Sequence, residues 1–104
     1  MNMQKMMKQM QQMQSQMART QEQLAAKTVE VSVGGGRVVV TATGGQEITS
    51  IKISKEIVDP NDVEVLEDLV LSGVQQALAK SKELAGSEMG KLTADMGLPP
   101  GLGL

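Results

Sequence analysis

The spacing of apolar residues changes twice along this 104-residue chain, and each spacing is typical of a different backbone. Residues 1–27 contain no Gly or Pro and repeat apolar side chains every three or four positions, which predicts one long helix. Residues 28–54 alternate apolar and polar side chains, as half-buried strands do. Residues 60–92 return to helical spacing. Because this length suits one domain, we predict a single α+β domain over residues 1–96.

The predicted first helix carries a narrow apolar stripe. Written as heptads, its a and d positions hold, apart from Thr20, the residues Met3, Met6, Met10, Met13, Met17 and Leu24. A stripe of about three heptads is typical of a helix that packs against a partner. Residues 1–27 would form a helix about 40 Å long, which protrudes beyond a small sheet. We therefore predict a homodimer and a packing seam along this stripe. A helix seam, strand-edge pairing and domain exchange would all cover the same apolar surface, and the spacing does not choose among these dimer geometries.

Glycines divide the alternating segment into three strands. Gly34–Gly36 and Gly44-Gly45 are short turns between them, which predicts an antiparallel meander. Ile48 is out of phase with the later isoleucines of the third strand, so we expect a β-bulge near Thr49-Ser50. Gly34–Gly36 precede a strand rather than a helix, and this context argues against a phosphate-binding loop.

The second predicted helix begins near Asp59, which suits an N-cap, and Pro60, which suits the first helical position. Gly86 either ends this helix or only weakens it, and the sequence does not decide between the two. Residues 97–104 are expected to form a flexible tail. Lys80-Ser81 is expected at the surface. The helix has a broad apolar stripe, as covering a sheet requires, made of Val63, Leu66, Leu69, Val70, Val74, Ala77, Leu78 and Leu84.

The composition argues against an enzyme. The chain has no His, Cys, Trp, Tyr or Phe. Thiol nucleophiles, Ser-His-Asp triads, the usual zinc sites and aromatic stacking on single-stranded bases are therefore excluded. We expect no cofactor, no metal and no small-molecule substrate. No apolar run is long enough for a signal peptide or a membrane span, so a cytoplasmic protein without a membrane partner is expected.

Charge is distributed unevenly along the chain, whose net charge is −2. Four cations and one Glu give residues 1–28 a net charge of +3, and residues 59–72 have −5. The acidic segment lacks the spacing of a calcium loop, so we interpret it as a helix start and a solvated face. A basic helix attracts phosphates, although a solvated helix face explains the same cations. The candidate DNA-binding residues are Lys5, Lys8, Arg19, Lys27, Lys80, Lys82 and Lys91.

The methionine stripe has three further interpretations. As a flexible apolar surface, it suits a protein–protein adaptor that binds amphipathic partner helices. Its thioethers at helical spacing suit a Cu(I) buffer, although no Cys or His supports such a site. A helix that lies on a membrane surface would carry Leu and aromatic anchors, which the stripe lacks.

Several segments together resemble one known family. After the first helix come GGGRVVVTATGGQEITSIKIS, VEVLEDLVLSGVQQALAKSKE, MGKLT and a GLPPGL tail. This order is similar to the YbaB/EbfC family of small bacterial nucleoid-associated proteins. The resemblance implies a tweezer-shaped homodimer that binds double-stranded DNA, shapes or protects the nucleoid and affects transcription.

The resemblance also implies where DNA is contacted, namely at the protruding first helix and the far end of the last one. It identifies no catalytic or base-reading residue. Little sequence preference is therefore expected, with localisation at the nucleoid. Ser72-Gly73 departs from the family pattern, in which we expect an Ala-rich helix at this point.

Overall fold

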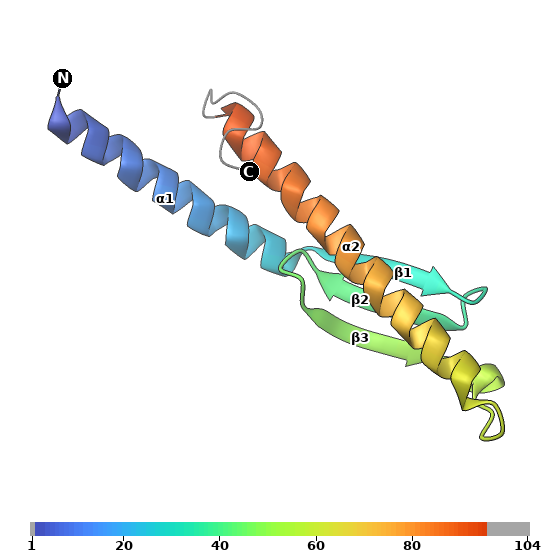
Figure 1. The fold of residues 1–104 in the computed structure, drawn as a ribbon. Helices are drawn as coiled ribbons and strands as arrows, with labels where there is room; N and C mark the ends of the chain where they lie inside the picture. Colours follow the sequence, from blue (N-terminus) through green and yellow to red (C-terminus); the bar gives the residue numbers. More distant parts are fainter. Residues whose placement is uncertain (1, 96–104) are drawn as a thin grey trace.

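The computed structural model describes residues 2–95, which form two long helices and one sheet (Figure 1). The molecule is elongated, with extents of 71 × 21 × 16 Å. The predicted order of helix, three strands and helix is confirmed, and the predicted tail of residues 97–104 lies outside the described residues. The elements are α1 (Met3–Ala26), β1 (Thr28–Val33), β2 (Val38–Thr43), β3 (Ile48–Ile53), the 3-10 turn η1 (Lys55–Ile57) and α2 (Val63–Asp95).

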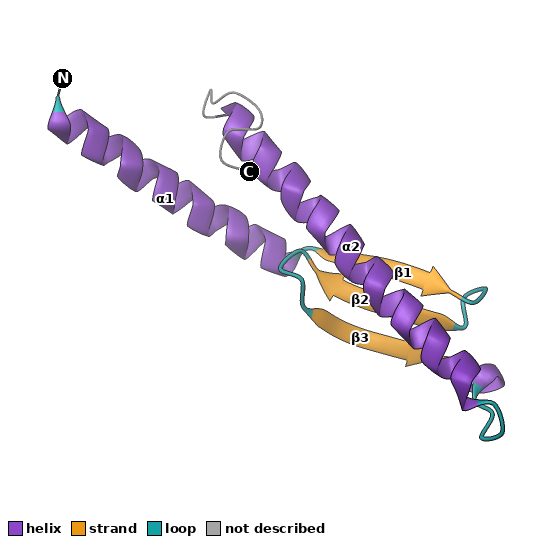
Figure 2. Cartoon of the chain, in the orientation of Figure 1, coloured by secondary structure: helices purple, strands orange, loops and turns teal. Residues whose placement is uncertain are grey.

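The sheet is the predicted antiparallel meander, with strand order β1-β2-β3 (Figure 2). Gly34–Gly36 all have positive φ angles, between 63° and 86°, which only glycine adopts readily. The predicted β-bulge is confirmed: Thr41 pairs with Ser50 and Ala42 with Ile48, so Thr49 is the extra residue. The bulge brings Ile48 onto the same face of the sheet as the other two isoleucines of β3.

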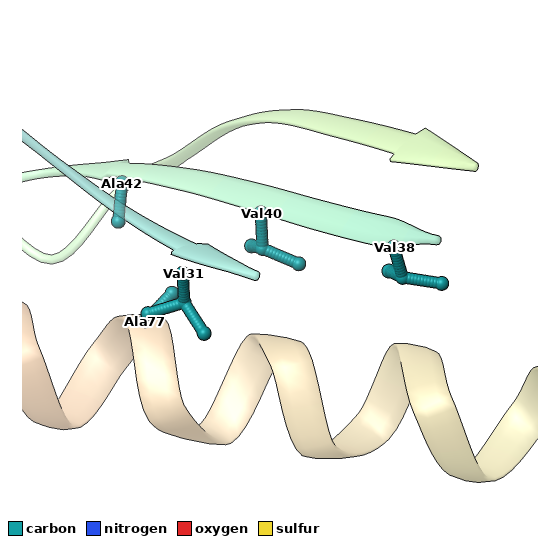
Figure 3. Close-up of a cluster of buried hydrophobic side chains, with 5 residues drawn as sticks. All are labelled: Val31, Val38, Val40, Ala42 and Ala77. Atoms are coloured by element: carbon teal, nitrogen blue, oxygen red, sulfur yellow. The ribbon is translucent and has the colours of Figure 1, made fainter. Parts of the chain in front are cut away.

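The core lies between the sheet and α2, which packs mainly on β1 and β2. Its fully or nearly fully buried apolar residues are Val31, Val38, Val40, Ala42 and Ala77 (Figure 3). The residues of α2 nearest the sheet are small and four positions apart, namely Gly73, Ala77 and Ser81.

The position of Gly73 explains its departure from the family pattern. A Cβ atom there would lie 2.7 Å from Cγ2 of Val40, so only glycine lets the helix approach so closely. The predicted stripe is confirmed at its centre, where Ala77 is fully buried and Leu69, Val70 and Val74 pack, partly buried, against the core. It was wrong at Val63, which is exposed.

Ser81 is fully buried, and its expected surface position was wrong. It follows Ala77 by one helical turn and therefore faces the turn between β2 and β3. Its hydroxyl donates to the carbonyl oxygen of Thr43 at 2.6 Å and accepts from the backbone N–H of Gln46 at 3.0 Å. These hydrogen bonds offset the cost of burying the hydroxyl and fasten α2 to the turn.

Both ends of α2 differ from simple expectation. Asp59 does not cap the helix: its side chain accepts from the backbone N–H of Asn61 at 2.9 Å, and its carbonyl accepts from that of Asp62 at 3.0 Å. Residues 59–62 thus form a turn, and the helix begins only at Val63. At the other end, α2 continues through Gly86 to Asp95.

We expect that replacing Gly86 and Gly90 with Ala stabilises the protein. No atom lies within 4 Å of a Cβ placed at either position, so the methyl groups meet no obstacle. Gly costs about 1 kcal/mol relative to Ala inside a helix, so the double variant should gain up to about 2 kcal/mol. Urea unfolding followed by far-ultraviolet circular dichroism measures the gain. A lowered unfolding midpoint would contradict the open geometry.

Candidate nucleic-acid interface

Most of α1 projects beyond the sheet as an arm (Figure 1). Only Thr20 and Leu24 on this helix are buried, and both lie near its C-terminal end. A Cβ atom at Gly44 would lie 2.7 Å from the carbonyl oxygen of Leu24, and the N–H of Gly44 donates to the carbonyl oxygen of Lys27 at 3.0 Å. The last turn of α1 is therefore held tightly against the sheet, whereas the rest of the arm remains accessible.

One face of the arm is basic. Arg19 follows Lys8 and Lys5 by 11 and 14 residues, or about three and four helical turns, so the three side chains share one face. All three are exposed, and they extend over about 21 Å of helix. Gln12 and Gln16 lie on the same face by the same spacing and are also exposed. This basic face points away from the methionine stripe.

Lys27 and Lys91, by contrast, share one acidic partner. The ammonium Nζ of Lys27 lies 2.5 Å from Oε1 of Glu88, and that of Lys91 lies 4.0 Å from the same oxygen. The hydrogen bond from Lys27 lowers the pKa of Glu88 below its ordinary value, and the positive charges of both lysines lower it further. This contact was not predicted from the sequence, because 61 positions separate Lys27 from Glu88.

The remaining two candidates lie apart from the arm. Lys80 donates from Nζ to the backbone carbonyl oxygen of Glu30 at 3.3 Å, which covers part of the β1 edge. Lys82 is exposed on another side of α2. The structure thus gathers Lys5, Lys8 and Arg19 on one face and does not bring the other four predicted cations to it.

The acidic residues occupy the opposite end of the molecule. The turn before α2 and its first turns lie far from the free end of α1 (Figure 1). Because these acidic residues lie far from the basic face, their charge does not oppose the approach of a polyanion to the arm. Within residues 2–95, the structure contains no cluster of three His, Cys, Asp or Glu side chains arranged to hold a metal. The acidic residues are Asp59, Asp62, Glu64, Glu67 and Asp68.

The methionine stripe is divided into two parts. Leu24 is only 6% exposed because it packs within its own chain, and Met13 is partly buried. Towards the free end, Met10 is 62% and Met3 77% exposed. The sheet end of the predicted seam is therefore occupied by contacts within the chain, and its free end is open.

The ion pair between Lys27 and Glu88 makes stability depend on pH. Because the pKa of Glu88 is lowered by folding, its charge stabilises the folded protein at neutral pH, and this contribution is lost as pH falls through the lowered pKa. We expect Glu88→Gln to be less stable than the wild type at pH 7. The difference should shrink steadily below pH 4.5. Urea unfolding at several pH values measures it, and a difference independent of pH would contradict the ion pair.

Comparison with known proteins extends these observations. The model of the YbaB/EbfC DNA-binding family matches residues 1–96. A nucleoid-associated protein of Moorella thermoacetica is 56% identical over 98 residues, covering 94% of both chains. One of Ruminiclostridium cellulolyticum is 54% identical over 101 residues, covering 97% of this chain and 88% of the relative.

A solved structure shares the fold. An uncharacterized protein from Helicobacter pylori superposes with a TM-score of 0.69 at 19% identity, covering 92% of this chain and 97% of the other. Within the described residues, neither helix has the length and apolar character needed to cross a membrane.

Proposed function

This chain belongs to the YbaB/EbfC DNA-binding family, and we propose that it binds double-stranded DNA as a homodimer with little sequence preference. In this role it shapes or protects the bacterial nucleoid and affects transcription. The site of binding is the basic face of the α1 arm, formed by Lys5, Lys8 and Arg19. The family supports DNA as the ligand, and the exposure of these three cations supports the location.

The single observation that carries the location is the gathering of three exposed cations on one face of a protruding helix. Lysine and arginine there contact phosphates, which carry no sequence information. Gln12 and Gln16 on the same face donate hydrogen bonds to phosphates or meet base edges. Arginine is a frequent bidentate reader of guanine, and this face offers a single one, Arg19, because the second arginine of the chain, Arg37, lies in the turn before β2, beyond the arm. Binding therefore follows the backbone of DNA rather than its sequence.

The test is the salt dependence of binding to labelled duplexes of unrelated sequence. A homodimer presents the three cations twice, so it engages about six phosphates and gives a log–log salt slope near −5. Affinity should fall about 1,000-fold between 50 and 200 mM salt. Similar affinities for all duplexes are expected. Absence of binding at 50 mM salt would overturn the proposal, and strong preference for one duplex would overturn its sequence tolerance.

The exposed free half of the methionine stripe supports a second candidate function. Met3 and Met10 form an accessible apolar surface on the arm, and flexible methionines suit an adaptor that binds partner helices. Such an adaptor would lose binding when Met10 and Met13 become Gln and would be indifferent to Lys5, Lys8 and Arg19. Substitution of the cations alone therefore distinguishes the two functions.

A further inference from the structure

Four methionines lie close together at the free end of the α1 arm. Met6 follows Met3 by three residues and precedes Met10 by four, whereas Met7 follows Met3 by four and precedes Met10 by three. Residues three or four apart are neighbours on a helix surface, with their Cβ atoms about 5–6 Å apart. The four side chains therefore share one face within two helical turns. We call Met3, Met6, Met7 and Met10 the thioether cluster.

The thioether cluster is open to solvent. Its side chains are between 45% exposed, at Met6, and 77% exposed, at Met3. The next methionine of the stripe, Met13, is partly buried, so the cluster occupies the part of the arm that the chain itself leaves uncovered. Packing within the described residues therefore does not explain why methionine stands at these four positions.

The chemistry of the cluster is that of a soft metal ligand. A methionine side chain has three rotatable bonds and a polarizable sulfur, so neighbouring sulfur atoms can turn toward one point above the helix. Thioethers select Cu(I) rather than hard ions such as Mg²⁺, which prefer oxygen. Seven of the nine methionines lie in the first 17 residues, and the chain has no Cys or His to compete for such an ion.

The charges around the cluster favour a monovalent ion over a divalent one. Lys5 and Lys8 lie on the other side of the same two turns, and α1 has no carboxylate before Glu22. The cluster also begins in the first turn after the N-cap Asn2, where the helix dipole is positive. Repulsion grows with the charge of the ion, so a divalent ion is repelled about twice as strongly as Cu(I), and neutral thioethers offset none of its charge.

We propose that the thioether cluster binds one Cu(I) ion per chain through its sulfur atoms. Each sulfur donates an electron pair to the ion, and no group is oxidised or reduced. Binding of Cu(I) does not depend on binding of DNA, because the cluster and the basic face lie on different sides of the arm. We thereby depart from the expectation that the protein binds no metal, which rested on the absence of Cys and His.

The first experiment titrates the whole chain with metal ions. Ag(I), which has the same closed d-electron shell and is stable in air, is followed by calorimetry in chloride-free buffer. Cu(I) is followed without oxygen, in competition with a chromogenic chelator. We expect one ion of either kind per chain and no binding of Zn²⁺. Failure of both Ag(I) and Cu(I) to bind, or binding of Zn²⁺ as tight as that of Cu(I), would overturn the proposal.

Replacement of the four methionines with Leu is the second experiment. Leu removes the sulfur but keeps the apolar surface and the helix propensity, so partner helices would still bind while Ag(I) and Cu(I) should not. Met7→Leu alone should weaken binding by more than about 10-fold, since even changes outside the ligands of a metal cost this much. Met17→Leu, two helical turns beyond the cluster, and Met89→Leu, on α2, are the matched controls and should bind as the wild type does. Circular dichroism checks that all variants fold, and unchanged binding in the fourfold variant would refute the site.

The donor atoms are identified by pH and by nuclear magnetic resonance. Metal sites built from His, Cys or carboxylates lose affinity as pH falls, because their ligands must be deprotonated. A thioether has no proton to lose, so the affinity for Ag(I) should be the same at pH 5 and at pH 8. The ε-methyl resonances of the thioether cluster should shift when Ag(I) is added, whereas those of Met17 and Met89 should not. A steep loss of affinity at low pH, or shifts confined to Met17 and Met89, would contradict the assignment.

One further variant separates the metal site from the proposed function. Replacing Lys5, Lys8 and Arg19 with Gln removes cations that repel the ion, so Cu(I) should bind at least as tightly as in the wild type. Loss of Cu(I) binding in this variant would overturn the thioether site. Failure of the protein to bind DNA would remove the proposed function and leave the metal site in place.

Discussion

Replacing Lys5, Lys8 and Arg19 together with Gln should abolish most of the salt-dependent affinity for duplex DNA. In a homodimer the substitution removes six cations that face phosphates. The log–log salt slope should therefore fall from about −5 to near zero, and at 50 mM salt the loss should be about 100-fold or more. Gln preserves the helix, because its helix propensity is close to that of Lys and Arg. Titration of labelled duplexes over 50–200 mM salt measures both quantities.

A matched control exists elsewhere in the chain. In the control variant Arg37, Lys52 and Lys55 become Gln, so net charge changes equally, but these residues lie in the turn before β2, on β3 and in η1. Arg37 makes only an exposed contact with Glu56, at 3.8 Å. The control should retain a salt slope near that of the wild type. Equal losses in the two triple variants would contradict a specific role for the arm and point to net charge alone.

Gly44→Ala should cause the largest loss of stability among single substitutions to Ala in the turns. The added Cβ would lie 2.7 Å from the backbone oxygen of Leu24 and 2.9 Å from its Cδ2 atom. A backbone atom cannot rotate away, so α1 must separate from the sheet. We expect a loss of about 2–3 kcal/mol and a melting temperature lower by roughly 10–20 °C. Thermal unfolding by circular dichroism measures the change.

The neighbouring glycine is the control for this substitution. A Cβ atom at Gly45 would lie 3.4 Å from Oγ1 of Thr43, which is an ordinary contact. Gly45→Ala should therefore stay within about 0.5 kcal/mol of the wild type. Wild-type stability in Gly44→Ala would show that the arm is not fixed at this point, and the orientation of the basic face relative to the sheet would then be variable.

The fixed junction bears directly on DNA binding. The contact between Leu24 and Gly44 and the ion pair between Lys27 and Glu88 both act on the last turn of α1. Together they hold the arm in one direction while leaving its basic face open. Fixing the arm before binding lowers the entropy lost when phosphates are contacted. Gly44 thus contributes to the proposed function without approaching the DNA.

The elements of the fold were predictable because their signals are local. The spacing of hydrophobic residues distinguishes a helix from a strand within a short segment. The turns were predictable because glycine adopts backbone conformations that other residues disfavour. The bulge at Thr49 was visible in the phase of Ile48 relative to the later isoleucines of β3. The basic face of α1 was predictable for the same reason, since Lys5, Lys8 and Arg19 lie on one continuous helix.

Predictions that depended on contacts between distant segments were less successful. The predicted start of α2 at Pro60 was wrong, and the helix begins at Val63, because the Asp59 side chain closes its own local turn instead of capping the helix. Ser81 is buried because a turn 35 residues earlier in the chain offers it hydrogen-bond partners. Gly73 was not part of the predicted stripe, yet it lies against the sheet, and its close approach to Val40 leaves no room for a side chain there.

The elements, their order and the separation of charge follow from the amino-acid sequence, because hydrophobic spacing, turn chemistry and charge are properties of neighbouring residues. Which apolar residues remain uncovered depends on how the helices pack on the sheet. Leu24 turned inward at the junction with the sheet, whereas Ile51, Ile53 and Leu71 were left open. Burial depends on how closely and at what angle α2 crosses the sheet, and that crossing is set by packing between residues far apart in the chain.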